Sequence, residues 1–373
     1  MEMPPEKVSE ENMKSFFGYI AVVDKHKPFI AMLFTQFVYA GMALFSKAAI
    51  AKGMDSYVFV VYRQAFASLA LAPFAFFLES EKAAPISYSI LCKIFLVSLC
   101  GLTLSLNLYY VAINHTSATF AAATTNTIPA ITFILAIILR METIAIKHKH
   151  GLAKVLGSVV GLSGAMVFAF AKGPPLNFMK WYSATHKQIS GTSNTDCSKV
   201  ECIKGSLIML SANTAWSLWL ILQVHIVKQY PAKLRLTALQ CFFSCIQSAV
   251  LAVAVQRNSS AWKLVWDVNL FSVAYCGIIV TGISHWLQVC AIEEKGPVFT
   301  AMFTPLALII TAIVSAFLWK ETFYLGSVGG TILLVVGLYS VLWGKNRESL
   351  KVEAHQDKQE TKEETILECI IQN

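Results

Sequence analysis

Residues 112–122 read AINHTSATFAA, and residues 291–301 read AIEEKGPVFTA, so two related stretches lie 179 positions apart in the chain. After a difference of ten residues, LGSVVG at 156–161 matches LGSVGG at 325–330. Between these stretches the first register continues through three threonine pairs and a matching glutamate pair. A sequence that repeats itself in this way predicts two copies of one structural unit.

The composition shows that the repeated unit lies in a membrane. Of the 373 residues, 56% are apolar and 14% are charged, and the mean hydropathy is +0.58. A soluble protein of this length needs a larger polar surface, so a soluble globular fold is excluded. The apolar residues form blocks of about 20, which is the length of a helix that crosses ~30 Å of hydrocarbon. Ten such helices are predicted, at 29–51, 57–78, 90–112, 118–139, 152–171, 205–227, 236–255, 270–290, 298–319 and 326–344.

The repeat sets the architecture. Residues 29–171 form the first repeat and residues 205–344 the second, with five predicted helices in each. Because five is odd, the second copy enters the membrane from the opposite side. The sequence therefore predicts an all-α membrane protein of ten transmembrane helices in two inverted five-helix repeats. The remaining segments are a cytosolic N-terminal tail at 1–28, an extracytosolic loop at 172–204 and a cytosolic C-terminal tail at 345–373.

Basic residues indicate the orientation. Lys and Arg are more frequent in the short segments on the side of the two termini, which predicts that both termini are cytosolic. The net charge of +8 is spread along this edge rather than over one soluble face, so binding to nucleic acid is not predicted. With this orientation, Cys197 and Cys202 lie on the extracytosolic side of the membrane. There they either form a disulfide or remain two free thiols.

Several function classes lack their sequence signatures. The chain contains no G-x-x-x-x-G-K-[ST], no H-E-x-x-H and no G-x-S-x-G, and the loop at 172–204 is too short for a catalytic domain. ATP-driven pumping by this chain alone and hydrolase chemistry are therefore not predicted. We expect no catalytic residue, no metal and no cofactor.

Prolines and glycines mark corresponding helices of the two repeats. Pro129 and Pro305 lie within predicted helices, and interrupted helices in corresponding positions point to a solute site near the midplane. The alternative is an ordinary packing kink. Gly157-x-x-x-Gly161 and Gly326-x-x-x-Gly330 allow close helix contact, which would join either the two repeats or two copies of the chain. A homodimer therefore stays open.

The polar residues inside the predicted spans are mostly neutral. No Asp or Glu lies in the interior of a span, which favours passive facilitation over proton coupling. Gln36 and Tyr39 share one face of the first helix, and Trp216 and Trp219 share a face of the sixth. Because unsatisfied polar groups are costly in lipid, we expect most of them to point inward. Neutral amides and aromatic rings suit a zwitterionic or uncharged organic solute.

Two ionisable residues in the spans each allow two interpretations. Arg63 either attracts a solute carboxylate from an outer vestibule or extends to the outer membrane interface. His285 either titrates near neutral pH and gates transport, or is a neutral packing residue.

Several strings resemble a known family: VVYRQAFASLALAPFAFF at 60–77, TSATFAAATTNTIPAITFILAIILRME at 116–142, YPAKL at 230–234, GPVFTAMFTPL at 296–306 and GLYSVLWGK at 337–345. They are similar to the plant nodulin-like transporters, which are EamA-type members of the drug/metabolite transporter superfamily. These proteins are also called usually-multiple-acids-move-in-and-out or Walls-Are-Thin-related transporters. The resemblance covers about 25–345 and is spread over both repeats.

The resemblance implies export or bidirectional movement of amino acids, and of auxin in some members. It implies residence in the plasma membrane, or in the vacuolar membrane for some members. By position, a central cavity between the repeats would draw on Gln36, Tyr39, Arg63, Asn107, Asn126, Asn213, Trp216, Gln288 and Pro305, and Trp219 shares the helix face of Trp216. The chain departs from many relatives at Leu106-Asn107 and at His285-Trp286, which leaves solute choice and pH response open.

The leading hypothesis is a membrane transporter that facilitates amino-acid movement by alternating access between two inverted repeats. One alternative is a carrier of auxin, another organic acid or another small metabolite, with or without proton coupling. The others are a membrane enzyme and a receptor or scaffold that transports nothing. The expected partners are a small-molecule solute and the lipid bilayer.

Overall fold

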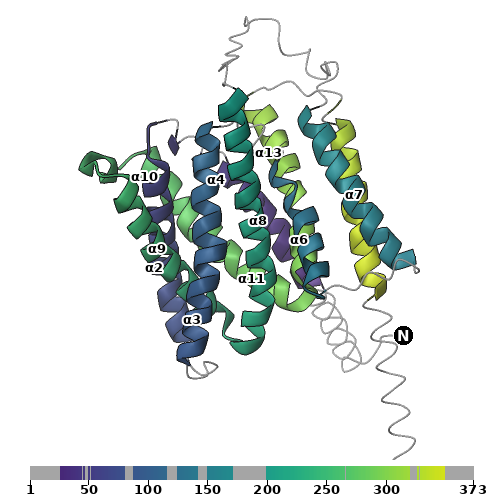
Figure 1. Cartoon of the computed structure of the whole chain (residues 1–373), viewed down its shortest axis with the longest axis horizontal. Helices are drawn as coiled ribbons and strands as arrows, with labels where there is room; N and C mark the ends of the chain where they lie inside the picture. The colour runs from purple at the N-terminus through teal and green to yellow at the C-terminus, as the bar shows by residue number, and fades with distance from the viewer. Residues whose placement is uncertain are drawn as a thin grey trace, which may run out of the picture. The chain divides into compact units, whose positions relative to one another are not determined.

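The structure is a computed structural model (Figure 1). It describes residues 26–43, 45–46, 49–50, 52–79, 87–115, 124–141, 149–170, 199–264, 266–319, 326 and 328–348. All regular structure in this part of the chain is helical. The glutamate pair Glu142/Glu321, the loop cysteine Cys197 and most of both tails lie outside the described residues, so the predictions on them stay predictions.

Helices occupy all ten predicted span positions within the described residues. Six are long and apolar enough to cross a membrane by length and composition: Ser56–Leu78, Tyr88–Ile113, Lys204–Gln229, Lys233–Val255, Val268–Lys295 and Val328–Glu348. Three shorter apolar helices are Ile128–Ile138, Gly151–Gly164 and Pro297–Thr311, and residues 26–43 are helical as well. The prediction of an all-α membrane protein is confirmed.

The described chain divides into two compact units, and each is considered by itself. Unit 1 comprises the described residues up to Asn107 and those from Leu222 to Thr311. Besides the helix at 26–43 and parts of α4, α8 and α13, it contains α2 (Ser56–Leu78), α3 (Tyr88–Val97), η1 (Ser98–Thr103), α9 (Lys233–Val255), η2 (Ser259–Trp262), α10 (Val268–Ala274), η3 (Tyr275–Ser284), α11 (His285–Lys295) and α12 (Pro297–Met302).

Helices α2 and α9 form the centre of unit 1, and each caps an end of the other. The N-terminus of α9 has no capping side chain of its own. Glu79, just after α2, accepts the first-turn N–H groups of Leu234 at 3.1 Å and Arg235 at 2.9 Å. In return, Arg235 Nε donates to the carbonyl of Ala75 in the last turn of α2, at 3.0 Å. These bonds satisfy backbone groups that a helix end leaves unpaired.

Two π-helical segments interrupt unit 1. η1 lies in the third predicted span and η3 in the eighth, so both repeats have one in their third helix. In η3 the hydroxyls of Thr281 and Ser284 donate to carbonyls five residues back, those of Cys276 and Ile279. These segments were not predicted from the sequence, and π-helical turns are often found at functional sites.

Unit 2 comprises the described residues from Leu108 to Ile221 and from Ala312 onward. It contains α6 (Ile128–Ile138), α7 (Lys149–Phe170) and Val328–Glu348, together with most of α8 (Lys199–Gln229) and parts of α4 (Leu104–His115) and α13 (Thr304–Trp319).

In unit 2, α7 and the yellow helix Val328–Glu348 lie side by side (Figure 1). A Cβ on Gly157 would lie 2.9 Å from the carbonyl oxygen of Gly337, and a Cβ on Gly337 would lie 2.6 Å from Cα of Gly161. The glycine pair of α7 therefore joins two helices of the same chain. Gly157 and Gly161 thus follow the alternative in which a glycine face joins the two repeats, and the glycine that faces them is Gly337. A homodimer stays a prediction.

An ion pair closes one end of this helix pair. Lys154 of α7 has a side chain that is only 2% exposed, and its ammonium group pairs with the Glu348 carboxylate at the end of the last described helix. No role was predicted for Lys154 from the sequence. A lysine inside an apolar span was the signal that could have found it.

Candidate functional site

A group of polar side chains lies in the interior of unit 1. We call it the Arg63 cluster, and it consists of Tyr39 from the helix at 26–43, Arg63 from α2, Thr281 from η3, and His285 and Gln288 from α11. Four helices of unit 1 therefore contribute to it. All five residues lie in stretches predicted from their apolar composition to span the membrane.

Arg63 is the only cation of this group that is charged at every physiological pH. Its side chain is 2% exposed, and its Nε donates to Thr281 Oγ1 at 2.6 Å. The guanidinium also lies within electrostatic reach of Tyr39 and His285. The interpretation in which Arg63 extends to the outer interface is therefore wrong, because the side chain is buried among helices of unit 1.

The close approach of η3 to α2 depends on a glycine. A Cβ on Gly277 would lie 2.5 Å from Cβ of Phe66 and 2.7 Å from the carbonyl oxygen of Arg63. Only a residue without a side chain fits there, and this contact brings Thr281 of η3 to Arg63. Thr281 was not predicted from the sequence, although Gly277 and Gly282 in an apolar helix were a signal of close packing.

The amide of Gln288 lies at the other side of the cluster. Its Nε2 donates to the hydroxyl of Tyr39 at 2.5 Å, while its Oε1 is buried and has no hydrogen-bond partner among the described residues. Gln36, one helical turn before Tyr39, also has a buried Oε1 without a partner there. Two amide oxygens in this interior thus have unused capacity to accept hydrogen bonds.

His285 follows η3 directly and is completely buried. Gln64, next to Arg63, is buried as well, and neither atom of its amide finds a partner among the described residues. Gln64 was not among the residues predicted from the sequence. Its position beside an arginine in an apolar helix was the available signal.

Asn107 belongs to a different polar contact of unit 1. Its Nδ2 donates to the carbonyl of Thr103 at 2.8 Å and to Ser248 Oγ of α9 at 3.2 Å. Thr103 in turn donates to Ser244 at 2.9 Å, also on α9. The described contacts of Asn107 therefore tie the third span to α9, and none of them is with the Arg63 cluster.

In unit 2, predicted site residues gather where the fourth predicted span is interrupted. Residues 124–125 are helical, 126–127 form a turn, and α6 begins at Ile128 with Pro129 in its first turn. Asn213 Nδ2 of α8 donates to the freed carbonyl of Thr124 at 2.7 Å, and Thr127 Oγ1 donates to the same carbonyl at 2.7 Å. Asn126 in the turn is buried.

Two tryptophans follow Asn213 along α8. The rings of Trp216 and Trp219 lie with centroids 5.0 Å apart, and Trp219 is completely buried. In unit 2 the structure therefore places four predicted residues, Asn126, Asn213, Trp216 and Trp219, on α8 and at the adjoining break.

The ninth predicted span is interrupted in the same way as the fourth. Phe303 separates α12 from α13, and Pro305 lies in the first turn of α13. The backbone at Phe303 has φ −77° and ψ −17°, as at Thr127 before α6. The prediction of interrupted helices is confirmed, but each proline starts a new helical segment instead of kinking a continuous one, since its missing N–H costs nothing there.

Comparisons with known proteins match almost the whole chain. The model of the EamA-like transporter family matches residues 26–164 and again 203–343, which confirms the predicted duplication. Three WAT1-related proteins of Arabidopsis thaliana are 60%, 46% and 40% identical over 93%, 87% and 87% of this chain, covering 98%, 92% and 82% of their own lengths. One solved crystal structure aligns with a TM-score of 0.64 at 13% identity, over 84% of this chain and 98% of that one, and shows the likeness of fold alone.

Proposed function

Because the chain belongs to the EamA-like transporter family, and within it to the WAT1-related proteins of plants, we propose that it moves amino acids across a plant membrane by alternating access. It is an integral membrane transporter of a small-molecule solute and not an enzyme. The observation behind the choice of solute is the Arg63 cluster, which combines one buried cation with neutral hydrogen-bonding groups.

The carboxylate of the amino acid is assigned to Arg63. A guanidinium offers a planar set of donors that matches a carboxylate, and a charge-assisted bond is strong away from water. The Nε bond to Thr281 fixes the orientation of the guanidinium. An arginine held in this way suits a monoanionic group, whereas a polyanion such as a sugar phosphate would need more cations.

The ammonium group is assigned to the neutral acceptors beside Arg63. Gln288 Oε1 and Gln36 Oε1 are both buried and have no partner among the described residues. An ammonium group has three donors and would satisfy such oxygens. Tyr39 links the two sides, because it shares a helix face with Gln36 and bonds to Gln288.

The other predicted residues stay in the proposal as parts of the solute route. They are Asn107, Asn126, Asn213, Trp216, Trp219 and Pro305. We propose that the two interrupted helices bend at the turns before Pro129 and Pro305 as the access of the solute changes. Movement is down the gradient of the solute, since no Asp or Glu lies in the interior of a predicted span to relay protons.

We propose the plasma membrane as the location, with both termini in the cytosol and the loop at 172–204 outside. The distribution of Lys and Arg in the short connections supports this orientation. The vacuolar membrane is the alternative location. Expression of the chain with a fluorescent tag at either end, combined with a quencher that cannot cross the membrane, tests both points.

The test of function is the flux of radiolabelled glutamine in proteoliposomes that contain the full chain. Exchange in both directions without a pH gradient is the expected result. Accumulation driven by an imposed pH gradient would overturn the facilitator part of the proposal and would make His285 the first residue to replace.

The second candidate solute is auxin or another organic acid, since a carboxylate without an ammonium group also satisfies Arg63. Competition separates the two. Unlabelled glutamine should inhibit labelled flux more strongly than indole acetate does, because only glutamine offers an ammonium group to Gln36 and Gln288. If indole acetate inhibits more strongly, the organic acid replaces the amino acid as the proposed solute. If neither solute is transported, the assignment of the Arg63 cluster to transport is contradicted.

A further inference from the structure

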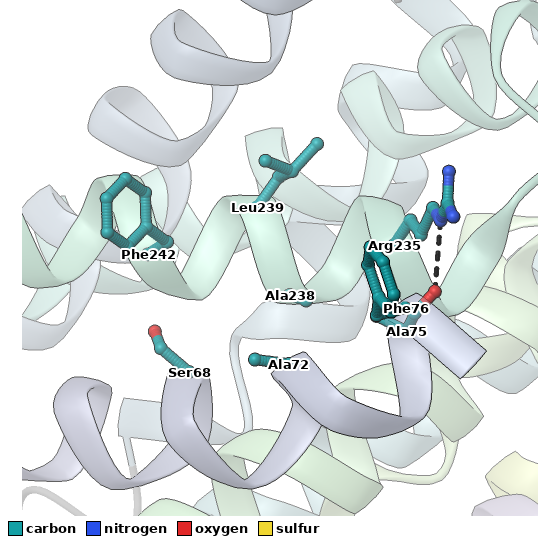
Figure 2. Close-up of a pocket in the computed structure, with 8 residues that line it drawn as sticks. All are labelled: Ser68, Ala72, Ala75, Phe76, Arg235, Ala238, Leu239 and Phe242. Atoms are coloured by element: carbon teal, nitrogen blue, oxygen red, sulfur yellow. Dashed lines mark hydrogen bonds between the residues drawn. The ribbon is translucent and has the colours of Figure 1, made fainter. Parts of the chain in front are cut away.

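A groove with a volume of about 280 Å³ lies between α2 and α9 in unit 1 (Figure 2). Its floor consists of small residues, Ala72 and Ala75 of α2 and Ala238 of α9. Phe76 and Phe242 are half or more exposed and form its aromatic walls, and Arg235 lies at one end. None of these residues belongs to the Arg63 cluster.

The groove runs from a membrane edge toward the membrane interior. Arg235 lies in the first turn of α9 and Ala75 in the last turn of α2, so this end of the groove lies where both spans end. From Arg235 to Phe242 the helix rises roughly 10 Å, at 1.5 Å per residue. A cation at the edge is thus followed by an apolar groove that extends over about two-thirds of the hydrocarbon thickness of one monolayer.

The described residues hold the Arg235 side chain in place without an ion pair to it, while the nearby Glu79 carboxylate accepts the backbone N–H of Arg235. Arg235 Nε donates to the carbonyl of Ala75, as the dashed line in Figure 2 shows, and the side chain forms no ion pair in the described part of the chain. The neighbouring Lys233, by contrast, pairs with Glu293. The outer nitrogens of the Arg235 guanidinium therefore remain available to an anion.

We propose that this groove binds an anionic phospholipid, with the headgroup phosphate at Arg235 and the upper part of one acyl chain between Phe76 and Phe242. The groove is complementary to such a lipid. The lipid has a charged headgroup at the interface, where Arg235 lies, and an apolar chain in the hydrocarbon, where the apolar part of the groove lies. Guanidinium groups bind phosphate through two parallel hydrogen bonds, and basic pockets between transmembrane helices bind anionic headgroups. This inference does not depend on the identity of the solute.

The site differs from an ordinary lipid-facing surface in two respects. The small floor residues leave a depression that a chain fills without moving protein side chains. The Nε bond fixes the guanidinium before binding, so less conformational entropy is lost when the phosphate arrives. An amino acid does not fit this chemistry, because Ser68 and Arg235 are the only polar side chains among the described residues that line the groove.

The test uses the full chain in nanodiscs of phosphatidylcholine with a minor fraction of phosphatidylglycerol. Native mass spectrometry after release measures which lipids remain bound. We expect phosphatidylglycerol to be enriched about fivefold over its share, as one basic residue near an anionic surface produces. Arg235→Gln should remove the enrichment. Lys228→Gln is the matched control, because Lys228 is an exposed cation at the same membrane edge outside the groove.

A second pair of variants tests the acyl-chain part. Ala72→Leu fills the groove at an exposed position and should lower the number of retained lipids of both kinds. Ala254→Leu adds the same side chain at an exposed position of α9 outside the groove and should change nothing. The site would be overturned if phosphatidylglycerol were enriched equally in Arg235→Gln and Lys228→Gln, or if Ala72→Leu retained as many lipids as the unmodified chain. Only unspecific boundary lipid would then remain as the explanation. Enrichment of phosphatidylcholine alone would overturn the role of Arg235.

Discussion

The Arg63 cluster of unit 1 and the helix break of unit 2 are both polar regions inside membrane spans, but their hydrogen bonds are used differently. At the break, Asn213 and Thr127 donate to the carbonyl of Thr124, which the interruption of the helix had freed. In the Arg63 cluster, the side-chain oxygen of Gln288 has no partner among the described residues, and the same holds for Gln36, one helical turn before Tyr39. The first region completes its own backbone, whereas the second retains capacity for another molecule.

This difference distinguishes polar residues that stabilise the fold of a membrane protein from those that can bind another molecule. A buried polar side chain whose bonds all go to backbone carbonyls stabilises the fold. A buried acceptor without a partner costs free energy in the empty protein, and a ligand that supplies the missing donor would recover that cost. Residue type alone does not separate the two, since amide side chains occur in both regions.

The largest effect should come from Arg63→Gln. Removing one partner of a buried charged pair costs 2–5 kcal/mol or more, so glutamine flux should fall by about 30-fold or more at low solute concentration. Proteoliposome flux measures this, and Arg257→Gln, which removes an exposed cation outside the spans, is the control. Equal flux in both variants would show that the buried guanidinium does not bind the solute.

A smaller effect with a different signature should follow from Gln288→Leu. This change removes the acceptor assigned to the ammonium group, and a hydrogen bond to a charged group contributes about 1.5–3 kcal/mol. Inhibition by glutamine should weaken about tenfold or more, while inhibition by a carboxylate without an ammonium group should change little. If both inhibitors weaken equally, the ammonium group does not bind at Gln288.

Asn213→Leu should lower stability rather than change solute choice. Two donors from Thr127, its N–H and its hydroxyl, still reach the Thr124 carbonyl, so the cost should be about 1 kcal/mol, as is usual for hydrogen bonds between membrane helices. A lower temperature of thermal unfolding, with an unchanged ratio of glutamine to indole acetate inhibition, is the expected outcome. A changed ratio of inhibition would show that the helix break is part of the solute site.

The smallest effect should come from Thr127→Val, which keeps the shape of the side chain and removes one donor. The carbonyl of Thr124 retains the N–H of residue 127 and the amide of Asn213. We expect a loss of stability below about 1 kcal/mol and unchanged transport. A larger loss than that of Asn213→Leu would reverse the order of importance of these two donors.

Much of the fold was predictable because its sequence signals extend over many residues. The blocks of apolar residues located the spans, and the repeat located the breaks, since Pro129 and Pro305 end the continuity of both helices. The register of the repeat was less accurate. The breaks lie two residues before each proline, which is a separation of 176 rather than the 179 of the flanking motif. A shift of this size is invisible in apolar sequence, where many alignments score alike.

The site was predictable in its residue types and not in its grouping. Polarity within an apolar span indicates that Arg63 and Gln288 matter, but only the packing of η3 against α2 brings Thr281 to Arg63. π-Helical geometry has no strong sequence signature, so this contact could not be foreseen. Similarly, the pairing of Asn107 with Ser248 depends on which helices are neighbours, which a single sequence does not give.

The reciprocal caps of α2 and α9 have a consequence for biogenesis. Glu79 and Leu234 of α9, whose backbone N–H donates to the Glu79 carboxylate, are 155 residues apart in the chain. At a synthesis rate of 5–20 residues per second, the end of α2 waits roughly 10–30 s in the bilayer before its partner emerges from the ribosome. During that interval the carboxylate of Glu79 and the last carbonyls of α2 rely on water and lipid headgroups. The first repeat is therefore inserted before it is finished, and the arrival of α9 completes it.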